Sequence, residues 1–85
     1  MGGINMEQYE LELIAKYGEK DEELRKLWQQ HLEYEKQVER LESKPYLTPQ
    51  DDLELKKIKK LKLAGKTKIQ AILQKYKKME EEQNK

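Results

Sequence analysis

The chain has 85 residues, of which 41% are charged and 35% hydrophobic, with no Cys, 4 Gly and 2 Pro. The missing cysteines exclude a disulfide framework, a cysteine zinc site and a thiol catalyst, and no apolar run approaches the ~20 residues of a membrane span. A composition rich in Glu, Lys, Leu and Gln predicts long helices. We therefore expect one all-α domain over residues 1–85.

Charge is unevenly distributed although the net charge is only +1. Residues 1–47 carry 7 basic and 11 acidic side chains, a balance of −4, whereas residues 48–85 carry 11 and 6, a balance of +5. Two halves of opposite sign could bind each other or a second copy of the chain. The first five residues have neither the basic patch nor the apolar run of a secretory signal, and Met6 does not fit a myristoylation pattern, so we expect a cytoplasmic protein.

The first predicted helix covers about residues 6–17, where Tyr9, Leu13 and Tyr17 recur at helical spacing. Gly18 follows, and we expect it to end this helix in a left-handed conformation. Asp21 is a good N-cap for a second helix over about residues 21–43. The apolar seam of this second helix has heptad spacing and comprises Leu24, Leu27, His31, Tyr34, Val38 and Leu41.

The third predicted helix covers about residues 48–79, with Thr48 as N-cap and Pro49 at its first position. We expect residues 80–85 to form a frayed tail. The seam of this helix again alternates three and four residues and comprises Leu55, Ile58, Lys62, Gly65, Ile69, Ile72, Tyr76 and Met79.

A short break between two heptad helices predicts an antiparallel, coiled-coil-like hairpin with the short first helix beside it. Pairing positions whose numbers sum to about 96 brings the two seams into register. The paired positions are Leu41 with Leu55, Val38 with Ile58, Tyr34 with Lys62, His31 with Gly65, Leu27 with Ile69, and Leu24 with Ile72. We expect the Lys62 stem to lie along the Tyr34 ring, with the ammonium outward or over the ring, and Glu35 to lie near Lys59 and Lys66.

His31 is the single histidine and could serve as a general base or a metal ligand. A metal site needs several converging ligands, and catalysis needs an adjacent acid or nucleophile. The seam offers neither, so we interpret His31 as a residue that fixes the register, with the ring facing Gly65. Gly65→Leu is then expected to crowd this layer. We predict no catalytic residue, no metal and no cofactor.

Four large side chains outside the two seams, or at their ends, are candidates for a protein-partner surface. They are Tyr17, Trp28, Leu32 and Tyr46. The same residues could instead form a small satellite core under the first helix.

Ten lysines and no acid lie between Leu55 and Met79, which raises the possibility of phosphate binding. The candidate phosphate contacts are Lys56, Lys57, Lys59, Lys60, Lys66 and Lys68. On a helical projection these lysines surround the apolar stripe, and no Arg or aromatic residue is interleaved among them for base readout or stacking. We therefore favour a solvated helix partnered by acidic residues, and keep nucleic-acid binding as the alternative.

The motif Ile58-Lys59-Lys60-x-Lys62-Leu63-x-x-Lys66-x-x-Ile69, together with the second-helix pattern of Leu27-Trp28, His31 and Leu41-Glu42, resembles the small bacterial YdcH-like family, a domain of unknown function. The resemblance covers about residues 13–73. Gly65 and Thr67 depart from it, since the family usually has Leu and Asp there. The resemblance implies a helical hairpin of a cytosolic bacterial type and implies no activity.

These observations favour a small non-enzymatic protein-interaction module, either an adaptor or a scaffold. A hairpin of this size buries little surface, so self-association is also expected. A membrane-surface role is not favoured because the apolar faces are committed to the hairpin. The different-class alternative is a weakly specific nucleic-acid-associated protein.

Overall fold

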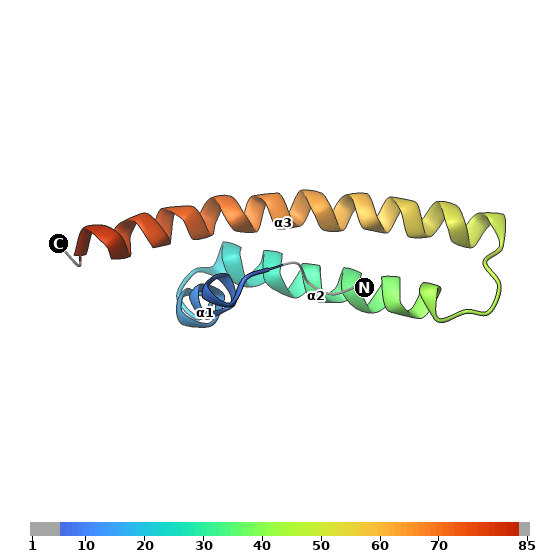
Figure 1. The fold of residues 1–85 in the computed structure, drawn as a ribbon, viewed down its shortest axis with the longest axis horizontal. Coiled ribbons are helices and arrows are strands. Elements are labelled where there is room, and N and C mark those ends of the chain that lie inside the picture. Colours follow the sequence, from blue (N-terminus) through green and yellow to red (C-terminus); the bar gives the residue numbers. More distant parts are fainter. Residues whose placement is uncertain (1–5, 84–85) are drawn as a thin grey trace.

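The computed structural model describes residues 6–83, which form three helices and no strand. They are α1 (Gln8–Tyr17), α2 (Glu22–Glu42) and α3 (Pro49–Gln83). Helices α2 and α3 form an antiparallel hairpin, and α1 crosses the end of the pair that lies away from the connecting loop (Figure 1). The predicted all-α hairpin with a short N-terminal helix is confirmed.

The helix starts follow from their capping residues. The Leu24 backbone N–H donates to the Asp21 carboxylate at 3.0 Å, as expected for an N-cap. At α3, the Asp51 N–H donates to the Thr48 hydroxyl at 3.0 Å while the Thr48 N–H donates to the Asp51 carboxylate at 3.2 Å. This reciprocal pair is a capping box, and it restarts the chain as a helix directly after the loop.

Gly18 ends α1 in a way that the sequence analysis did not foresee. Its backbone is right-handed, with φ −61° and ψ −26°, so the expected left-handed cap is wrong. A Cβ at this position would lie 2.5 Å from the Ile14 carbonyl oxygen. Glycine is therefore required here for the close approach of the last turn and not for a positive φ.

Helix α3 continues to Gln83, so the expectation of fraying from residue 80 is wrong for residues 80–83. The reason is that Glu80 has partners on α1: its carboxylate pairs with the Lys16 ammonium and accepts a hydrogen bond from the Tyr17 hydroxyl at 2.7 Å. The rest of the expected tail, residues 84–85, lies outside the described residues, as do residues 1–5.

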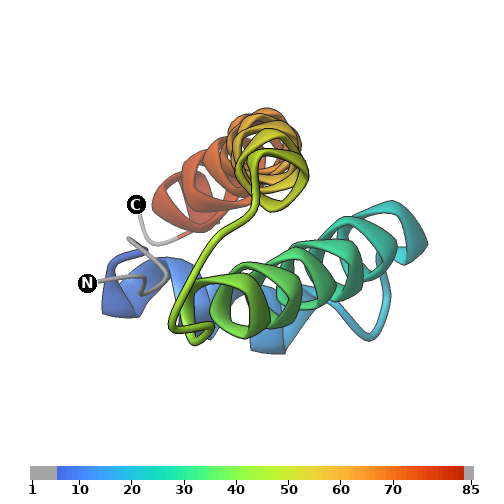
Figure 2. The same cartoon turned by 90° about the vertical axis from the view of Figure 1, so that its right-hand side faces the viewer.

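The hydrophobic core is divided into two clusters along the hairpin. The first lies where α1 packs on α2 and α3, and its buried members are Met6, Leu13, Ile14, Leu24, Ile69 and Leu73. The second lies toward the loop, and its buried members are Val38, Leu41, Leu55 and Ile58. Figure 2, viewed from the loop end, shows α1 and α2 on the same side of α3. The long helix α3 therefore packs against two partners.

The buried face of α3 departs from the predicted seam beyond Ile69. Leu73 is buried where Ile72 was expected, and Met79 is 47% exposed while Glu80 faces α1. On a straight α-helix, positions seven residues apart shift around the helix axis by about 20° per heptad, so a strict heptad seam does not stay on one face. The second packing partner, α1, contacts α3 through Leu73 and Glu80, two positions outside the predicted seam.

Candidate interaction surfaces and a buried polar layer

A polar layer separates the two hydrophobic clusters. His31 is 2% exposed and Glu35 is 7% exposed, both on α2, and Lys62 reaches them from α3. The Lys62 ammonium forms an ion pair with the Glu35 carboxylate. The ammonium therefore lies neither outward nor over the Tyr34 ring, the two placements expected for it, because a buried carboxylate attracts that ammonium more strongly than a ring face does.

Glu35 therefore does not pair with Lys59 or Lys66, its expected neighbours. Lys59 pairs with Glu42 instead, at 3.1 Å. Glu35 lies deep in the interface, whereas Glu42 lies at the edge, within reach of a lysine on the flank of α3.

His31 lies in this layer without a hydrogen-bond partner on either ring nitrogen among the described residues. Its Nε2 is 4.0 Å from the Glu35 carboxylate, and its ring stacks on Trp28 with centroids 5.5 Å apart. Burial lowers the pKa of His31, and the positive charges of Lys62 and Lys66 lower it further, while Glu35 acts in the opposite direction. The ring is thus held neutral, and no group of three or more metal-ligating side chains occurs in residues 6–83.

Gly65 does not provide the close-fitting space that was expected opposite the histidine ring. A Cβ built on Gly65 finds no heavy atom of a neighbouring element within 4 Å. The Cβ of a side chain at this position would therefore meet open space, and the crowding expected of Gly65→Leu stays a prediction for the atoms beyond the Cβ.

The four predicted partner residues divide into two pairs. Tyr17 stacks on Tyr76, with ring centroids 4.0 Å apart and planes 11° from parallel, and both Tyr17 and Trp28 pack against the first core cluster. Their placement matches the satellite-core alternative. Leu32 is 36% exposed on α2, and Tyr46 is 86% exposed in the loop. The loop that carries Tyr46 lies at the opposite end of the molecule from α1, which carries Tyr17 (Figure 1).

The loop end of the hairpin carries two further exposed apolar side chains that the sequence analysis did not single out. Leu47 is 41% exposed and Leu53, in the second turn of α3, is 68% exposed. Leu53 falls off the heptad seam, which is the signal that could have identified it. We call Tyr46, Leu47 and Leu53 the apolar tip.

The end of the molecule away from the tip is closed by polar contacts between α1, α3 and the start of α2. The Tyr76 hydroxyl donates to the Asp21 carboxylate at 2.6 Å, which lowers the pKa of Asp21 and raises that of Tyr76. The hydrogen bond to Glu80 likewise raises the pKa of Tyr17. The Lys77 ammonium lies 4.9 Å from the centre of the Tyr9 ring. These contacts attach both α1 and the start of α2 to α3.

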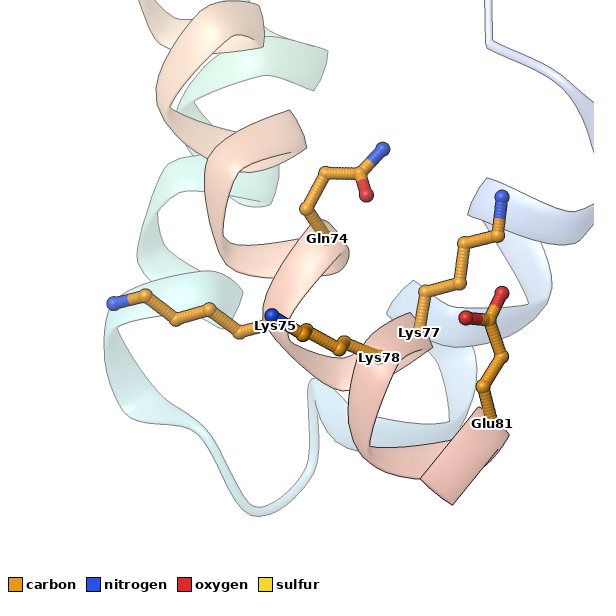
Figure 3. A pocket seen from close by; sticks show the side chains of 5 residues that line it. All are labelled: Gln74, Lys75, Lys77, Lys78 and Glu81. Carbon is orange, nitrogen blue, oxygen red and sulfur yellow. The ribbon is translucent and has the colours of Figure 1, made fainter. Parts of the chain in front are cut away.

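The fold divides most lysines of α3 into a paired and an unpaired group. Lys56 pairs with Asp52 at 3.0 Å, and Lys59 and Lys62 pair with acids of α2. Lys66, a predicted phosphate contact, is half-buried and forms no ion pair within 4.0 Å among the described residues, so it belongs to neither group. Near the C-terminal end, Lys77 points toward α1 and Lys75 points away from it (Figure 3). Five exposed lysines make no ion pair within 4.0 Å among the described residues: Lys57, Lys60, Lys68, Lys75 and Lys78.

These five lysines, which we call the outer lysine stripe, share one face of α3. Positions 57, 60, 64, 68, 71, 75 and 78 follow one another at intervals of three or four, and all seven are exposed. The interpretation that the lysines only surround the apolar stripe is therefore wrong for this unpaired group. None of the helices in the described part of the chain is apolar over enough of its length to cross a membrane.

Comparison with known proteins gives one match. A family model described as "Protein of unknown function (DUF465)" matches residues 24–73, which include α2 from its third residue and α3 as far as Leu73. No curated protein and no solved structure matches the chain.

Proposed function

We propose that this chain, which belongs to the DUF465 family of proteins of unknown function, is a small non-enzymatic protein-interaction module that acts as an adaptor or scaffold. The resemblance to the YdcH-like family is confirmed, because the YdcH family is in DUF465. Membership assigns no activity, so the proposal depends on the surfaces and on the polar groups of the hairpin. The cytoplasmic location and the self-association expected from the sequence stay predictions.

The observation that carries the proposal is the apolar tip. Tyr46 exposes 86% of its surface and Leu53 exposes 68%, although the neighbouring Leu41 and Leu55 are almost fully buried. Large aromatic and aliphatic side chains left in water at one end of a rod are typical of an anchor that a partner covers. The loop also holds its backbone in place, since Lys44 pairs with Asp51 at 3.1 Å and Asp51 caps α3.

The polar layer supports a structural role better than a catalytic one. The carboxylate of Glu35 is bound to Lys62, and the ring of His31 is covered by Trp28 and by both helices. A general base must reach a substrate proton within hydrogen-bond distance. A polar residue in a helical seam commonly selects one register and one orientation of the helices, and we assign this role to His31.

The proposal is tested by affinity capture of the tagged full-length chain from the source cell, with and without nuclease. We compare the wild type with a tip variant, Tyr46→Ser with Leu53→Ser. A matched control is Leu61→Ser with Leu63→Ser, which removes two leucines exposed at 42% and 65% on the body of α3. Both variants are checked for an unchanged helical signal.

We expect a nuclease-resistant protein partner that the tip variant loses and the control retains. Equal capture by all three chains would contradict the assignment of the tip. Loss of every partner on nuclease treatment would contradict the protein-interaction proposal itself.

A further inference from the structure

We propose that the outer lysine stripe of α3 binds duplex nucleic acid through its phosphates, without reading the base sequence. This inference does not depend on the apolar tip, which lies at one end of the rod. It concerns a face of α3 that neither α1 nor α2 covers.

The first argument is the distribution of paired and unpaired lysines around α3. Lys56, Lys59 and Lys62 form ion pairs with Asp52, Glu42 and Glu35, respectively. The Lys77 ammonium lies over the Tyr9 ring. No acidic residue occurs between positions 55 and 79 to neutralise the outward face. The five charges of the stripe therefore lie on one side of the helix and add to a positive field there, while Lys75 also acts on Asp21 and lowers its pKa.

The second argument is the shape of the stripe. Twenty-one residues separate Lys57 from Lys78, which at ~1.5 Å per residue makes about 32 Å. One turn of B-form duplex is about 34 Å long, so a helix of this length lying along the duplex crosses both strands, and its long lysine side chains can reach phosphates of each. The positions between the lysines are Ala64 and Ala71, whose small side chains let the phosphate backbone approach the helix closely.

The third argument is what the stripe lacks. No arginine lies between positions 55 and 79 to read base edges, and the single aromatic residue there, Tyr76, is turned inward against Tyr17 and Asp21. Single-stranded nucleic acid is usually bound by base stacking, which this face cannot provide. Anionic membranes are bound by large apolar side chains between the basic ones, and the stripe has alanines there. Phosphates of a duplex fit the face best.

The test is fluorescence polarisation of a labelled 20-base-pair DNA duplex at four salt concentrations between ~25 and ~200 mM. The stripe variant is Lys57→Gln, Lys60→Gln and Lys68→Gln. The matched control is Lys20→Gln, Lys36→Gln and Arg40→Gln, which removes three exposed positive charges outside α3. Vesicles containing phosphatidylserine are titrated in parallel.

With five phosphates neutralised, the log–log slope of affinity against salt is expected near −4.5, at about −0.9 per phosphate. The stripe variant should reduce the slope to about −1.8, and the control should keep the wild-type slope. At ~150 mM salt we expect a Kd of about 10⁻⁴–10⁻⁶ M, the range of non-specific binding.

Three results would overturn the inference. One is no duplex binding at ~50 mM salt with ~100 μM protein, conditions that favour non-specific contacts. A second is an equal loss of slope in both triple variants, which would indicate diffuse charge and no defined face. The third is binding to the vesicles that requires the stripe while the duplex is not bound, which would assign the face to a lipid surface.

Discussion

Replacing His31 by leucine is expected to stabilise the hairpin. Both ring nitrogens are buried without a hydrogen bond, and leaving such a group unsatisfied costs about 1–3 kcal/mol. The substitution removes that cost but also removes the stacking of the ring on Trp28, which contributes about 0.5–1.5 kcal/mol. The Glu35–Lys62 pair stays in place. We expect a net gain of about 1 kcal/mol, which for a chain of this size raises the Tm by about 4–8 °C.

The pH dependence gives a second, independent readout of the same substitution. Burial lowers the pKa of His31 in the folded chain below its ordinary value of 6.5, so between the two pKa values the unfolded chain binds more protons. The stability of the wild type is therefore complete above pH 6.5 and falls as the pH drops below it. His31→Leu lacks this loss, so its advantage over the wild type should widen between pH 7.5 and pH 5.

The assay is urea or thermal unfolding followed by circular dichroism at both pH values, on wild type and variant at one protein concentration. A variant less stable than the wild type by 1 kcal/mol or more at pH 7.5 would refute the reasoning, because it would mean that the ring nitrogens are satisfied in the folded chain. So would an identical pH dependence for the two proteins.

Three further outcomes follow from the contacts of single residues. Gly65→Ala should raise stability by about 0.8–1.0 kcal/mol in the same unfolding assay, since its Cβ meets open space and alanine favours a helix, and a lower stability would contradict the described helix spacing. Gly18→Ala should lower stability by about 1–3 kcal/mol, the usual cost of overpacking, because its Cβ would lie 2.5 Å from the Ile14 carbonyl oxygen; an unchanged Tm would refute this contact. The pKa of Tyr17 should fall toward its ordinary value in Glu80→Gln, measured as the alkaline absorbance difference from Tyr17→Phe, and an unshifted titration would argue against the α1–α3 hydrogen bond.

The hairpin could be predicted from the sequence because its signals are local. Asp21 and Thr48 start their helices through side chains three residues from the groups they cap, and the heptad spacing pairs the seams without knowledge of anything else. The ion pair between Glu35 and Lys62 and the hydrogen bond between Asp21 and Tyr76 both join positions whose numbers sum to 97, close to the predicted register.

The features that could not be predicted depend on α1, the helix that packs against the hairpin. The change of the buried face of α3 from Ile72 to Leu73 and the continuation of the helix through Glu80 both result from the docking of α1, which the heptad pattern does not contain. The Lys62 ammonium was expected outward or over the Tyr34 ring because the sequence does not reveal how deeply Glu35 is buried.

The same limit applies to the candidate surfaces. Tyr46 could be identified from its position in the loop. The only signal for Leu53 was its place off the heptad seam, and this signal is weak because a single off-seam leucine on a helix is common. The outer lysine stripe emerges only once the ion pairs on the flanks of α3 are known. Both Lys59 and Lys60 are exposed, and only the structure shows that Lys59 is paired, with Glu42, while Lys60 forms no ion pair within 4.0 Å among the described residues.

The central claim is that the apolar tip contacts a protein partner, and a photo-crosslinking amino acid at position 46 in the living source cell tests it most directly. The same group at position 63, where the leucine is 65% exposed on the body of α3, is the control. The account predicts a discrete crosslinked protein band from position 46 that survives nuclease treatment and is absent from position 63. A band at twice the mass of the chain would identify a second copy as the partner. No band from position 46, or the same bands from both positions, would contradict the claim.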